Sequence, residues 1–379
     1  MKRKLLINWL YYRPVGHVVE ALKLTRGYAE ANRNIDVYLL LNAASPIELA
    51  EACPWIKRTY AVSLKEVWKD GRNAKSIKAL PKTWDYIITD DRATRFKRRW
   101  DENNLIKAHK ILSPLLTAKI ESGYREQSFA KSGFLPYRRN PKINLVVTRK
   151  AKVFAKRYAH SGPAICIMLG GSAGNTQSPT VKMWLEVCRA LVKAIPDLKI
   201  YFTGVTKGIK GRTNTIDFAL KDVKYLTDNL PNAEAAYNIG LWNQLALIQK
   251  CDIFLSPHTG FGFLPQLIGT PWLELGNCPW PAYVFNGEPF YSVLPECGWY
   301  PARGETKKGC GKRLREGKKA LCMTDKLLRK KILEVVKGAK FLLDPTFAYK
   351  KALRLHLNKL KKPPYDFKRF FFLDGVGSL

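Results

Sequence analysis

At 379 residues the chain is long enough for two domains of ordinary size, each with its own core. No segment approaches the roughly 20 apolar residues that a membrane-spanning helix needs, which argues against an integral membrane protein. The 65 Lys and Arg residues against 31 Asp and Glu give a formal net charge of +34, and a surface of that sign attracts polyanions such as nucleic acid, anionic lipid headgroups or phosphorylated substrates.

The start of the chain imitates a signal peptide but fits a buried first strand better. Three basic residues precede the apolar run 5–10, which is short and contains Asn8. The run continues into Tyr11-Tyr12-Arg13-Pro14 with no small-residue cleavage site. We therefore expect a cytoplasmic protein, with peripheral contact at the inner membrane face if its basic surface binds anionic lipid.

The first part of the chain alternates strand-like and helix-like segments. The strand at 5–10 is followed by a helix from about Val18 to Ala31 and by the buried-strand run 35–41. Ser45 and Pro46 have the cap and first-turn character of another helix, and 84–89 is a further strand. Strands separated by helices predict a parallel, doubly wound α/β sheet.

Residues 92–160 are strongly basic and less regular, and a second α/β series follows them. We expect a first domain over 1–158, a second over 159–345 with an insertion at 278–322, and a C-terminal helix and tail over 346–379. The expected strands of the second series are 164–169, 198–202, 252–255 and 271–275, its helices are 181–194 and 241–249, and 324–360 reads as two helices around Pro345.

Two loops stand out because each follows a strand and opens a helix. They are Pro14-Val15-Gly16-His17 and Ser256-Pro257-His258-Thr259-Gly260. Open α/β sheets bind ligands at the carboxyl ends of their strands. Two such loops, one in each half of the chain, predict a cleft between two domains with a histidine on either side.

Further motifs of the second half resemble the lipopolysaccharide heptosyltransferase-like glycosyltransferases, family 9, in order and spacing over most of the chain. They are the loop Gly170-Gly171-Ser172-Ala173-Gly174-Asn175, the strand end Thr203-Gly204, the loop His258-Thr259-Gly260 and Gly269-Thr270-Pro271. The resemblance implies the GT-B architecture: two Rossmann-like, doubly wound domains facing a central cleft, with a C-terminal helix crossing back to the first domain.

The chain departs from the family at two matched positions. The family has a Gly-Asp pair after its first strand, where the Asp is the proposed base; Gly16-His17 stands here and is similar to other inverting GT-B enzymes that use a histidine. The Asp of the family's Asp-Thr/Ser-Gly loop is His258. A lysine that some members carry has no counterpart near Gln177 and Ser178, which leaves the donor open.

The resemblance implies an inverting glycosyltransferase that moves a sugar from a nucleotide-diphosphate donor, linked to ADP, GDP or UDP, to an acceptor hydroxyl. His17 would be the general base, since imidazole titrates near working pH; the alternative is a histidine that caps its helix or packs under it. Gly16, Asp90 and Asp91 would lie on the acceptor side, and either Asp would orient His17 or bind the acceptor unless it serves only as a cap or turn.

The donor would bind to the loops of the second domain. Backbone N–H groups at helix starts, with glycines that allow close approach, hold phosphate oxygens. This assigns Gly170, Gly171, Ser172, Thr203, Gly204, Thr259 and Gly260 to the donor. His258 would add a hydrogen bond to the diphosphate or the sugar, or is simply a loop histidine. No metal cofactor is expected for the chemistry, because helix starts and basic groups balance the leaving-group charge.

Four cysteines are crowded into the expected insertion. Cys278, Cys297, Cys310 and Cys322 are spaced too widely for a CxxC knuckle. Some members of the family carry a Cys-rich insertion that ends with a Cys just before a helix, which is where Cys322 stands. A structural zinc or iron ion is one interpretation, with Cys278 the weakest ligand. Thiols in a loop, with one pair bonded at most, are the other.

The sequence leaves alternatives open for the acceptor and for the class of function. The charge suits an anionic glycolipid at a membrane or a nucleic acid carrying a hydroxylated base, unless lysine usage is merely high throughout. A small metabolite or a protein is a further acceptor class. A sugar-nucleotide epimerase shares the architecture but needs a carboxylate cluster that we cannot assemble. A nucleic-acid-binding protein on an inactive GT-B scaffold is the rival outside the enzymes.

Overall fold

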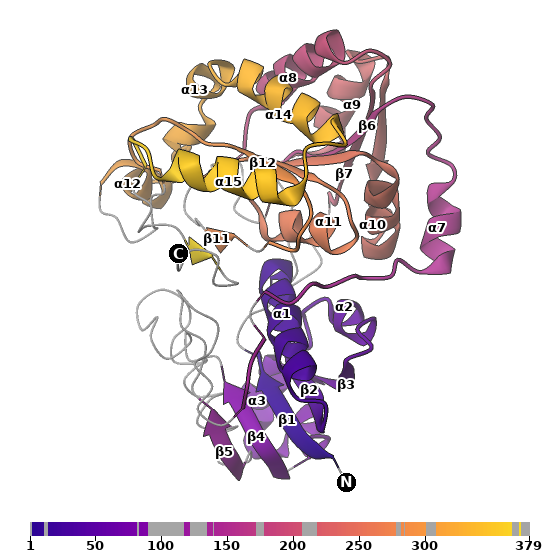
Figure 1. Cartoon of the computed structure of the whole chain (residues 1–379), viewed down its shortest axis with the longest axis vertical. Helices are drawn as coiled ribbons and strands as arrows, with labels where there is room; N and C mark the ends of the chain where they lie inside the picture. The colour runs from indigo at the N-terminus through magenta and orange to yellow at the C-terminus, as the bar shows by residue number, and fades with distance from the viewer. Residues whose placement is uncertain are drawn as a thin grey trace. The chain divides into compact units, whose positions relative to one another are not determined.

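A computed structural model gives the structure of the chain. It describes residues 2–10, 14–81, 83–89, 117–121, 135–138, 140–171, 178–206, 218–277, 282–283, 285–300, 308–365 and 371–372. The chain forms two compact units, the first running up to Leu145 and the second starting at Val146. In Figure 1 the first unit runs from indigo to magenta and the second from magenta to yellow.

The first unit contains a sheet of five parallel strands in the order β3-β2-β1-β4-β5. The strands are β1 (Arg3–Asn8), β2 (Ile35–Asn42), β3 (Ile56–Val62), β4 (Thr83–Thr89) and β5 (Thr117–Glu121). The helices are α1 (Val15–Ala31), α2 (Ile47–Glu51), α3 (Leu64–Asp70) and α4 (Lys75–Lys78), with a 3-10 turn, η1 (Gly71–Asn73), between the last two. The expected doubly wound character of this half is confirmed.

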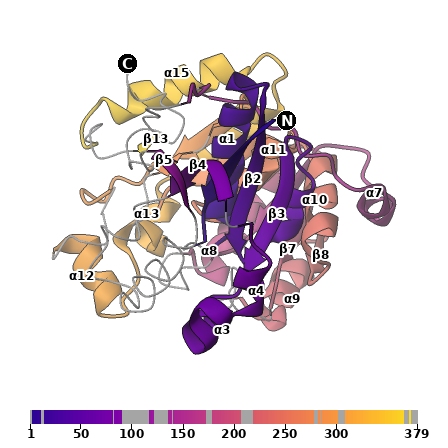
Figure 2. The same ribbon diagram turned by 90° about the horizontal axis from the view of Figure 1, so that it is seen from below.

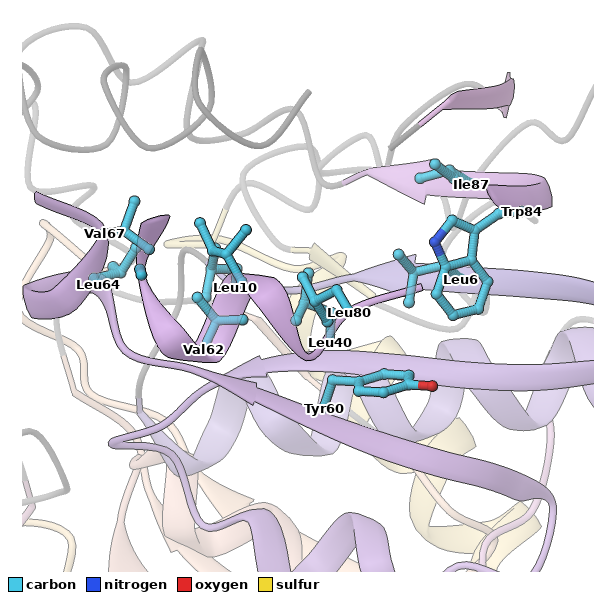
Figure 3. Close-up of a cluster of buried hydrophobic side chains, with 12 residues drawn as sticks. Leu6, Leu10, Leu40, Tyr60, Val62, Leu64, Val67, Leu80, Trp84 and Ile87 are labelled. Atoms are coloured by element: carbon cyan, nitrogen blue, oxygen red, sulfur yellow. The ribbon is translucent and has the colours of Figure 1, made fainter. Parts of the chain in front are cut away.

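Both faces of this sheet are buried because its central strands are apolar on both sides. Helix α1 packs on β2 and β3. On the other face, Leu6, Leu40 and Trp84 from three neighbouring strands converge with Leu64 and Val67 of α3, as Figure 3 shows. Figure 2 shows α1 and α3 separated, with the strands of the unit between them. Burying one Leu side chain fully stabilises the fold by about 2 kcal/mol. Because both faces of the sheet are covered in this way, a ligand site can form only at the ends of the strands.

The second unit contains six parallel strands in the order β12-β10-β9-β6-β7-β8. They are β6 (Ala164–Met168), β7 (Lys199–Gly204), β8 (Ala233–Tyr237), β9 (Ile253–Pro257), β10 (Trp272–Leu275) and β12 (Phe290–Val293). Every residue of β6, β9, β10 and β12 is buried, as expected for parallel strands covered on both faces. Two short strands, β11 (Ala282–Tyr283) and β13 (Phe371–Phe372), lie outside the two sheets.

The helices of the second unit form two groups (Figure 1). Helix α14 packs on α8 and on β9, β10 and β12, while α10 packs on α7, α11 and β6. The helices are α7 (Arg149–Ala155), α8 (Val181–Ala194), α9 (Leu220–Asp228), α10 (Leu241–Lys250), α11 (Phe263–Leu267), α12 (Gly309–Arg315), α13 (Asp325–Arg329), α14 (Ile332–Leu343) and α15 (Tyr349–Leu360), with 3-10 turns η4 (Gly260–Gly262) and η5 (Leu321–Met323).

Two boundaries in the structure differ in detail from the expectations. The units divide at Leu145 rather than after residue 158, because α7 packs against α10 of the second unit. Helix α1 begins at Val15 rather than near Val18, so His17 lies inside its first turn. Helix α15 packs on β12 of the second unit; a contact of 346–379 with the first domain, and the cleft between domains, stay predictions.

Within the described residues, no helix combines the length and the apolar character that crossing a bilayer demands.

Candidate functional site

The first candidate group is a histidine paired with a carboxylate at the carboxyl edge of the first sheet. Strand β1 ends at Asn8, and α1 begins after Pro14, whose carbonyl oxygen accepts hydrogen bonds from the N–H groups of His17 (3.0 Å) and Val18 (3.3 Å). His17 Nδ1 lies 3.1 Å from Glu20 Oε2. The His17 side chain is 32% exposed and that of Glu20 only 7%.

The chemistry of this pair follows from which groups can donate. An ionised carboxylate only accepts hydrogen bonds, so Glu20 selects the tautomer with the proton on His17 Nδ1. The lone pair is then on Nε2, and the carboxylate stabilises the ring when Nε2 takes up a second proton. A partly exposed imidazole held in this way can act as a general base.

Asp90 and Asp91, which the sequence offered as residues that orient His17, bind the acceptor or serve only as a cap or turn, lie outside the described residues. The carboxylate that the structure places on His17 is Glu20, one turn along the same helix. Residues three apart are neighbours on a helix surface, so the His-x-x-Glu spacing carried the signal for this pair. Gly16 is buried in the same first turn of α1.

A buried lysine extends this row on α1. Lys23 is 1% exposed, and its Nζ donates to the carbonyl oxygen of Pro141 at 2.5 Å. Asn32, at the end of the helix, donates from Nδ2 to the carbonyl oxygen of Pro136 at 2.9 Å. The segment that leaves the first unit is therefore fastened along the helix that carries His17.

The second candidate group is a pair of touching loops at the carboxyl edge of the second sheet. Gly170 and Gly171 follow β6, and Thr259 and Gly260 follow β9. A Cβ on Gly171 would lie 2.3 Å from Thr259 Cγ2, closer than atoms can approach. Only glycine lets the two loops meet here, so the structure brings together two loops that the sequence assigns to one ligand. Ser172 lies outside the described residues.

The Thr259 loop offers hydrogen-bond donors. Thr259 is extended, its side-chain oxygen accepts from the N–H of Gly262 at 3.3 Å, and Gly260 opens the turn η4. The first N–H groups of a helical turn have no partner within the turn. Because η4 and α11 have only 3 and 5 residues, these N–H groups, rather than a helix dipole, are what the loop presents to an anion.

Thr203 and Gly204 make hydrogen bonds that hold β7 to its neighbours in the second unit. The Thr203 side chain is fully buried, and its hydroxyl donates to the carbonyl oxygen of Ala236 in β8 at 3.1 Å. The carbonyl oxygen of Gly204 accepts from Gln244 Nε2 at 3.1 Å and from the Asn238 N–H at 2.9 Å. The side chain of Thr203 is thus turned to its neighbouring strand, so its hydroxyl is already used within the sheet.

A buried histidine–carboxylate pair lies behind the Thr259 loop. His258 Nδ1 is 2.5 Å from Glu274 Oε1, and the hydroxyl of Ser292 donates to Glu274 Oε2. The side chains of His258 and Glu274 are 4% and 0% exposed. The three residues come from the end of β9, from β10 and from β12, where Glu274 stands opposite Ser292 in the strand register.

The carboxyl group of Glu274 is held in its charged form. Burial by itself raises the pKa of Glu274, but His258 beside it, the Ser292 hydroxyl and the more distant His356 together hold that pKa below its usual value. The rings of Phe263 and Trp272 flank His258, each 5.8 Å from it between ring centres. In these apolar surroundings the charge of Glu274 is screened little by water.

His356 approaches the same cluster from α15. Burial lowers the pKa of His356 to about 3, although the negative charge of Glu274 opposes this. The ring lies 5.3 Å from that of Phe290 between centres. The sequence interpretation missed Glu274, Ser292 and His356; the one available signal was an acidic residue inside the apolar run Trp272-Leu273-Glu274-Leu275.

The cysteines do not assemble a metal centre among the residues that the structure describes. Cys310 and Cys322 are buried, and Cys310 Sγ accepts from the Leu321 N–H at 3.3 Å. Cys297 is half-buried. Across the described ranges, no three His, Cys, Asp or Glu side chains form a group that would hold a metal ion. Cys278 lies outside those ranges, so a site that includes it stays a prediction.

Comparison of the sequence with family models and with curated proteins gives no match. Solved structures match nearly the whole chain. A glycosyltransferase family 9 protein from Veillonella parvula has a TM-score of 0.60 at 13% identity, over 90% of this chain and 98% of that one. The chain has the GT-B fold.

Two further GT-B structures agree with this assignment. The ADP-heptose lipopolysaccharide heptosyltransferase II of E. coli has a TM-score of 0.52 at 12% identity, over 90% of this chain and 100% of that one. E. coli heptosyltransferase WaaC with ADP-2-deoxy-2-fluoro heptose has a TM-score of 0.50 at 13% identity, over 87% and 99%. The resemblance to this fold family, expected from the motifs, is confirmed.

Proposed function

We propose that the protein is an inverting glycosyltransferase that moves a sugar from a nucleoside-diphosphate donor to an acceptor hydroxyl. The observation that carries the proposal is the His17–Glu20 pair, which stands at the carboxyl edge of the first sheet. In open α/β folds that edge is where ligands bind. The fold match to heptosyltransferases supports the same reaction class.

In this proposal His17 is the general base. Its Nε2 takes the proton of the acceptor hydroxyl while that oxygen forms a bond to the anomeric carbon. The bond from the anomeric carbon to the diphosphate oxygen breaks, and its electron pair leaves with the nucleoside diphosphate. Glu20 accepts the hydrogen bond from Nδ1–H and stabilises the imidazolium that forms. Attack from the face opposite the leaving group inverts the anomeric centre.

The donor would occupy the edge where Gly171 and Thr259 meet. Backbone N–H groups of the Thr259-Gly260 turn would bind the phosphate oxygens and balance the charge that grows on the leaving group. WaaC is named as bound to an ADP-heptose analogue, which supports a sugar donor linked to ADP, with GDP- and UDP-linked donors as the alternatives. We propose no metal ion for the chemical step.

The acceptor that the charge favours is an anionic glycan or glycolipid. The protein would reach such an acceptor by binding peripherally to the inner face of a membrane. The net charge of +34 supports this choice, because anionic lipid surfaces attract clustered Lys and Arg. A hydroxylated nucleic acid is the second candidate acceptor, since the same charge attracts its phosphates.

The test is thermal stabilisation by ADP, GDP, UDP and their sugar conjugates. We expect one nucleotide series to stabilise the wild type and to lose its effect in Gly171→Ala, whose new Cβ forces Thr259 away. Gly162→Ala is the matched control: its Cβ would meet the carbonyl oxygen of Asp197 at 2.7 Å, at the opposite end of β6. That variant should keep the nucleotide response. A wild type that none of these compounds stabilises contradicts the proposal.

A further inference from the structure

The outer face of α14 carries an exposed leucine in a row with lysines. The face of the helix that packs on the sheet consists of Val335, Gly338, Ala339 and Leu342. Leu333, Lys337 and Lys340 follow one another at four and three residues, which places them together on the opposite face. Leu333 is 82% exposed, more than any other large hydrophobic residue that the structure describes. The helix therefore presents an aliphatic side chain to its surroundings.

The lysines around Leu333 carry positive charge that no carboxylate balances. Lys330 precedes Leu333 by three residues, and Lys337 follows it by four, so all lie within one turn of each other. Within the ranges that the structure describes, no carboxylate pairs with Lys330, Lys337 or Lys340. We call Leu333 and these three lysines the α14 patch.

The carboxylates of α13 and α14 are engaged away from the patch. Glu334 accepts from Lys359 Nζ at 2.8 Å, and Asp325 accepts from the Thr180 hydroxyl at 2.9 Å. Asp344, just beyond the end of α14, accepts a backbone N–H at 2.8 Å. The patch therefore keeps its positive charge for a ligand outside the helix.

The support under the patch is fixed. Helices α13 and α14 both pack on α8 (Figure 1). Arg329 of α13 holds Glu186 of α8 through two contacts, at 2.6 and 2.7 Å. Gly338 brings α14 so close to the sheet that a Cβ would lie 2.5 Å from the Tyr291 ring. The exposed side chains of the patch are thus presented on a rigid surface.

An anionic bilayer fits both properties of the patch. Its phospholipid headgroups attract lysines, and the boundary of its acyl chains takes up an aliphatic side chain. A nucleic acid would satisfy only the lysines, because its phosphates offer Leu333 no apolar surroundings. A second copy of the chain would bring like charges together across this face. The combination of charge and exposed leucine therefore favours lipid.

We propose that the α14 patch is the surface through which the second unit docks on an anionic phospholipid bilayer. Leu333 inserts at the level of the headgroups, and Lys330, Lys337 and Lys340 bind the lipid phosphates. Helix α14 then lies along the bilayer surface, because the patch follows the axis of the helix. This inference rests on the membrane contact that the proposed function includes, and it names the residues that make the contact.

Co-sedimentation of the full chain with mixed phosphatidylglycerol and phosphatidylcholine vesicles, at about 0.1 M salt and without nucleotide, tests the inference. Leu333→Ser should weaken binding about tenfold, because the inserted side chain is lost. Lys330→Gln, Lys337→Gln and Lys340→Gln together should weaken it about hundredfold, the effect of three lysines at an anionic surface. All four positions are exposed, so both variants should fold, and circular dichroism checks this.

The matched controls lie on α7, which packs on α10 rather than on α8. Val153→Ser removes another apolar side chain from the surface, at a residue that is 58% exposed. Lys150→Gln, Lys152→Gln and Lys156→Gln together remove as many charges from exposed positions as the triple variant of the patch. Both control variants should bind the vesicles like the wild type.

The outcomes separate the inference from the function on which it rests. If the two triple variants lose the same affinity, net charge alone attracts lipid, which overturns the inference and leaves peripheral membrane binding standing. If Leu333→Ser binds like the wild type while duplex DNA displaces the vesicles, the patch belongs to nucleic acid and the inference is wrong. A wild type that binds no vesicles overturns the inference and the membrane contact, whereas the transferase reaction is tested separately by nucleotide stabilisation.

Discussion

Two histidine–carboxylate pairs occur in this chain, one in each unit, and their surroundings suit different work. The His17 side chain is about one-third exposed, whereas that of His258 is nearly buried with Glu274 behind it. The first arrangement favours proton transfer, whereas in the second burial limits the screening of the Glu274 carboxylate by water.

Removing the imidazole of His17 should abolish most of the transferase activity. We expect His17→Ala to lower kcat by about 10²–10⁴-fold, the range typical of general bases, with nucleotide affinity unchanged. Glu20→Gln, which keeps the shape but not the charge, should have a smaller effect of about tenfold. Where no acceptor is at hand, the rate at which each variant hydrolyses the nucleotide-sugar donor measures both effects.

The control for His17 is a histidine outside the candidate site. His160 pairs with the Tyr201 hydroxyl at 3.3 Å, so His160→Gln should retain activity. If His17→Ala keeps wild-type turnover while binding the nucleotide, His17 is not the base.

His356 should make the second unit sensitive to acid. Its pKa is about 3 when folded and about 6.5 when unfolded, so between these values the unfolded chain binds the extra proton. Its stabilising contribution is complete above about pH 6.5. Below that pH the free energy of unfolding falls by up to about 1.4 kcal/mol per pH unit. Urea unfolding at several pH values measures this slope, which should be shallower in His356→Leu; equal slopes would contradict the assignment.

At the level of elements, the strands that were predicted correctly are those with continuous apolar runs. Strand β9 (Ile253–Pro257) is buried throughout and matches its expected position. Strand β8 (Ala233–Tyr237) was not predicted, because it is an edge strand of small and acidic residues whose positions are mostly half-exposed. An edge strand with one neighbour leaves little hydrophobic pattern to recognise.

The sequence predicts only those parts of the candidate site that directly follow a recognisable strand. The Gly171 and Thr259 loops were assigned to one edge because parallel strands place their carboxyl ends together. Glu274 and His356 could not be assigned, since they reach His258 from another strand and from a distant helix. Only the strand register and the packing of α15 reveal such contacts.

Helix α14 lies so close to the sheet that it tolerates no side chain at Gly338. A Cβ there would lie 2.5 Å from the Tyr291 ring and 2.8 Å from Leu273 Cδ1. Gly→Ala within an exposed helix ordinarily stabilises by about 1 kcal/mol. Here we expect Gly338→Ala to destabilise by about 1–3 kcal/mol, because α14 must move away from β10 and β12. Chemical denaturation measures the change in the free energy of unfolding, and a more stable Gly338→Ala variant would contradict the close packing. The control is Lys337→Ala, at an exposed position of the same helix, which should be nearly neutral.

On the scale of the whole molecule, the charge is the dominant feature. With a net charge of +34, the protein should bind vesicles containing phosphatidylglycerol at low salt and release them as salt screens the attraction. Neutral phosphatidylcholine vesicles are the control. Co-sedimentation at increasing salt measures the effect, with duplex DNA as a competitor. Binding that ignores salt would contradict an electrostatic surface, and preference for DNA would favour the nucleic-acid acceptor.

The cluster around Glu274 also has a consequence for folding kinetics. The cluster joins Glu274 of β10 to Ser292 of β12 and to His356 of α15, the last helix that the structure describes. Contacts over such separations form slowly, because the chain must first close a long loop. The finished donor edge thus belongs to a late folding event, and a bound nucleotide should slow unfolding while leaving the folding rate almost unchanged.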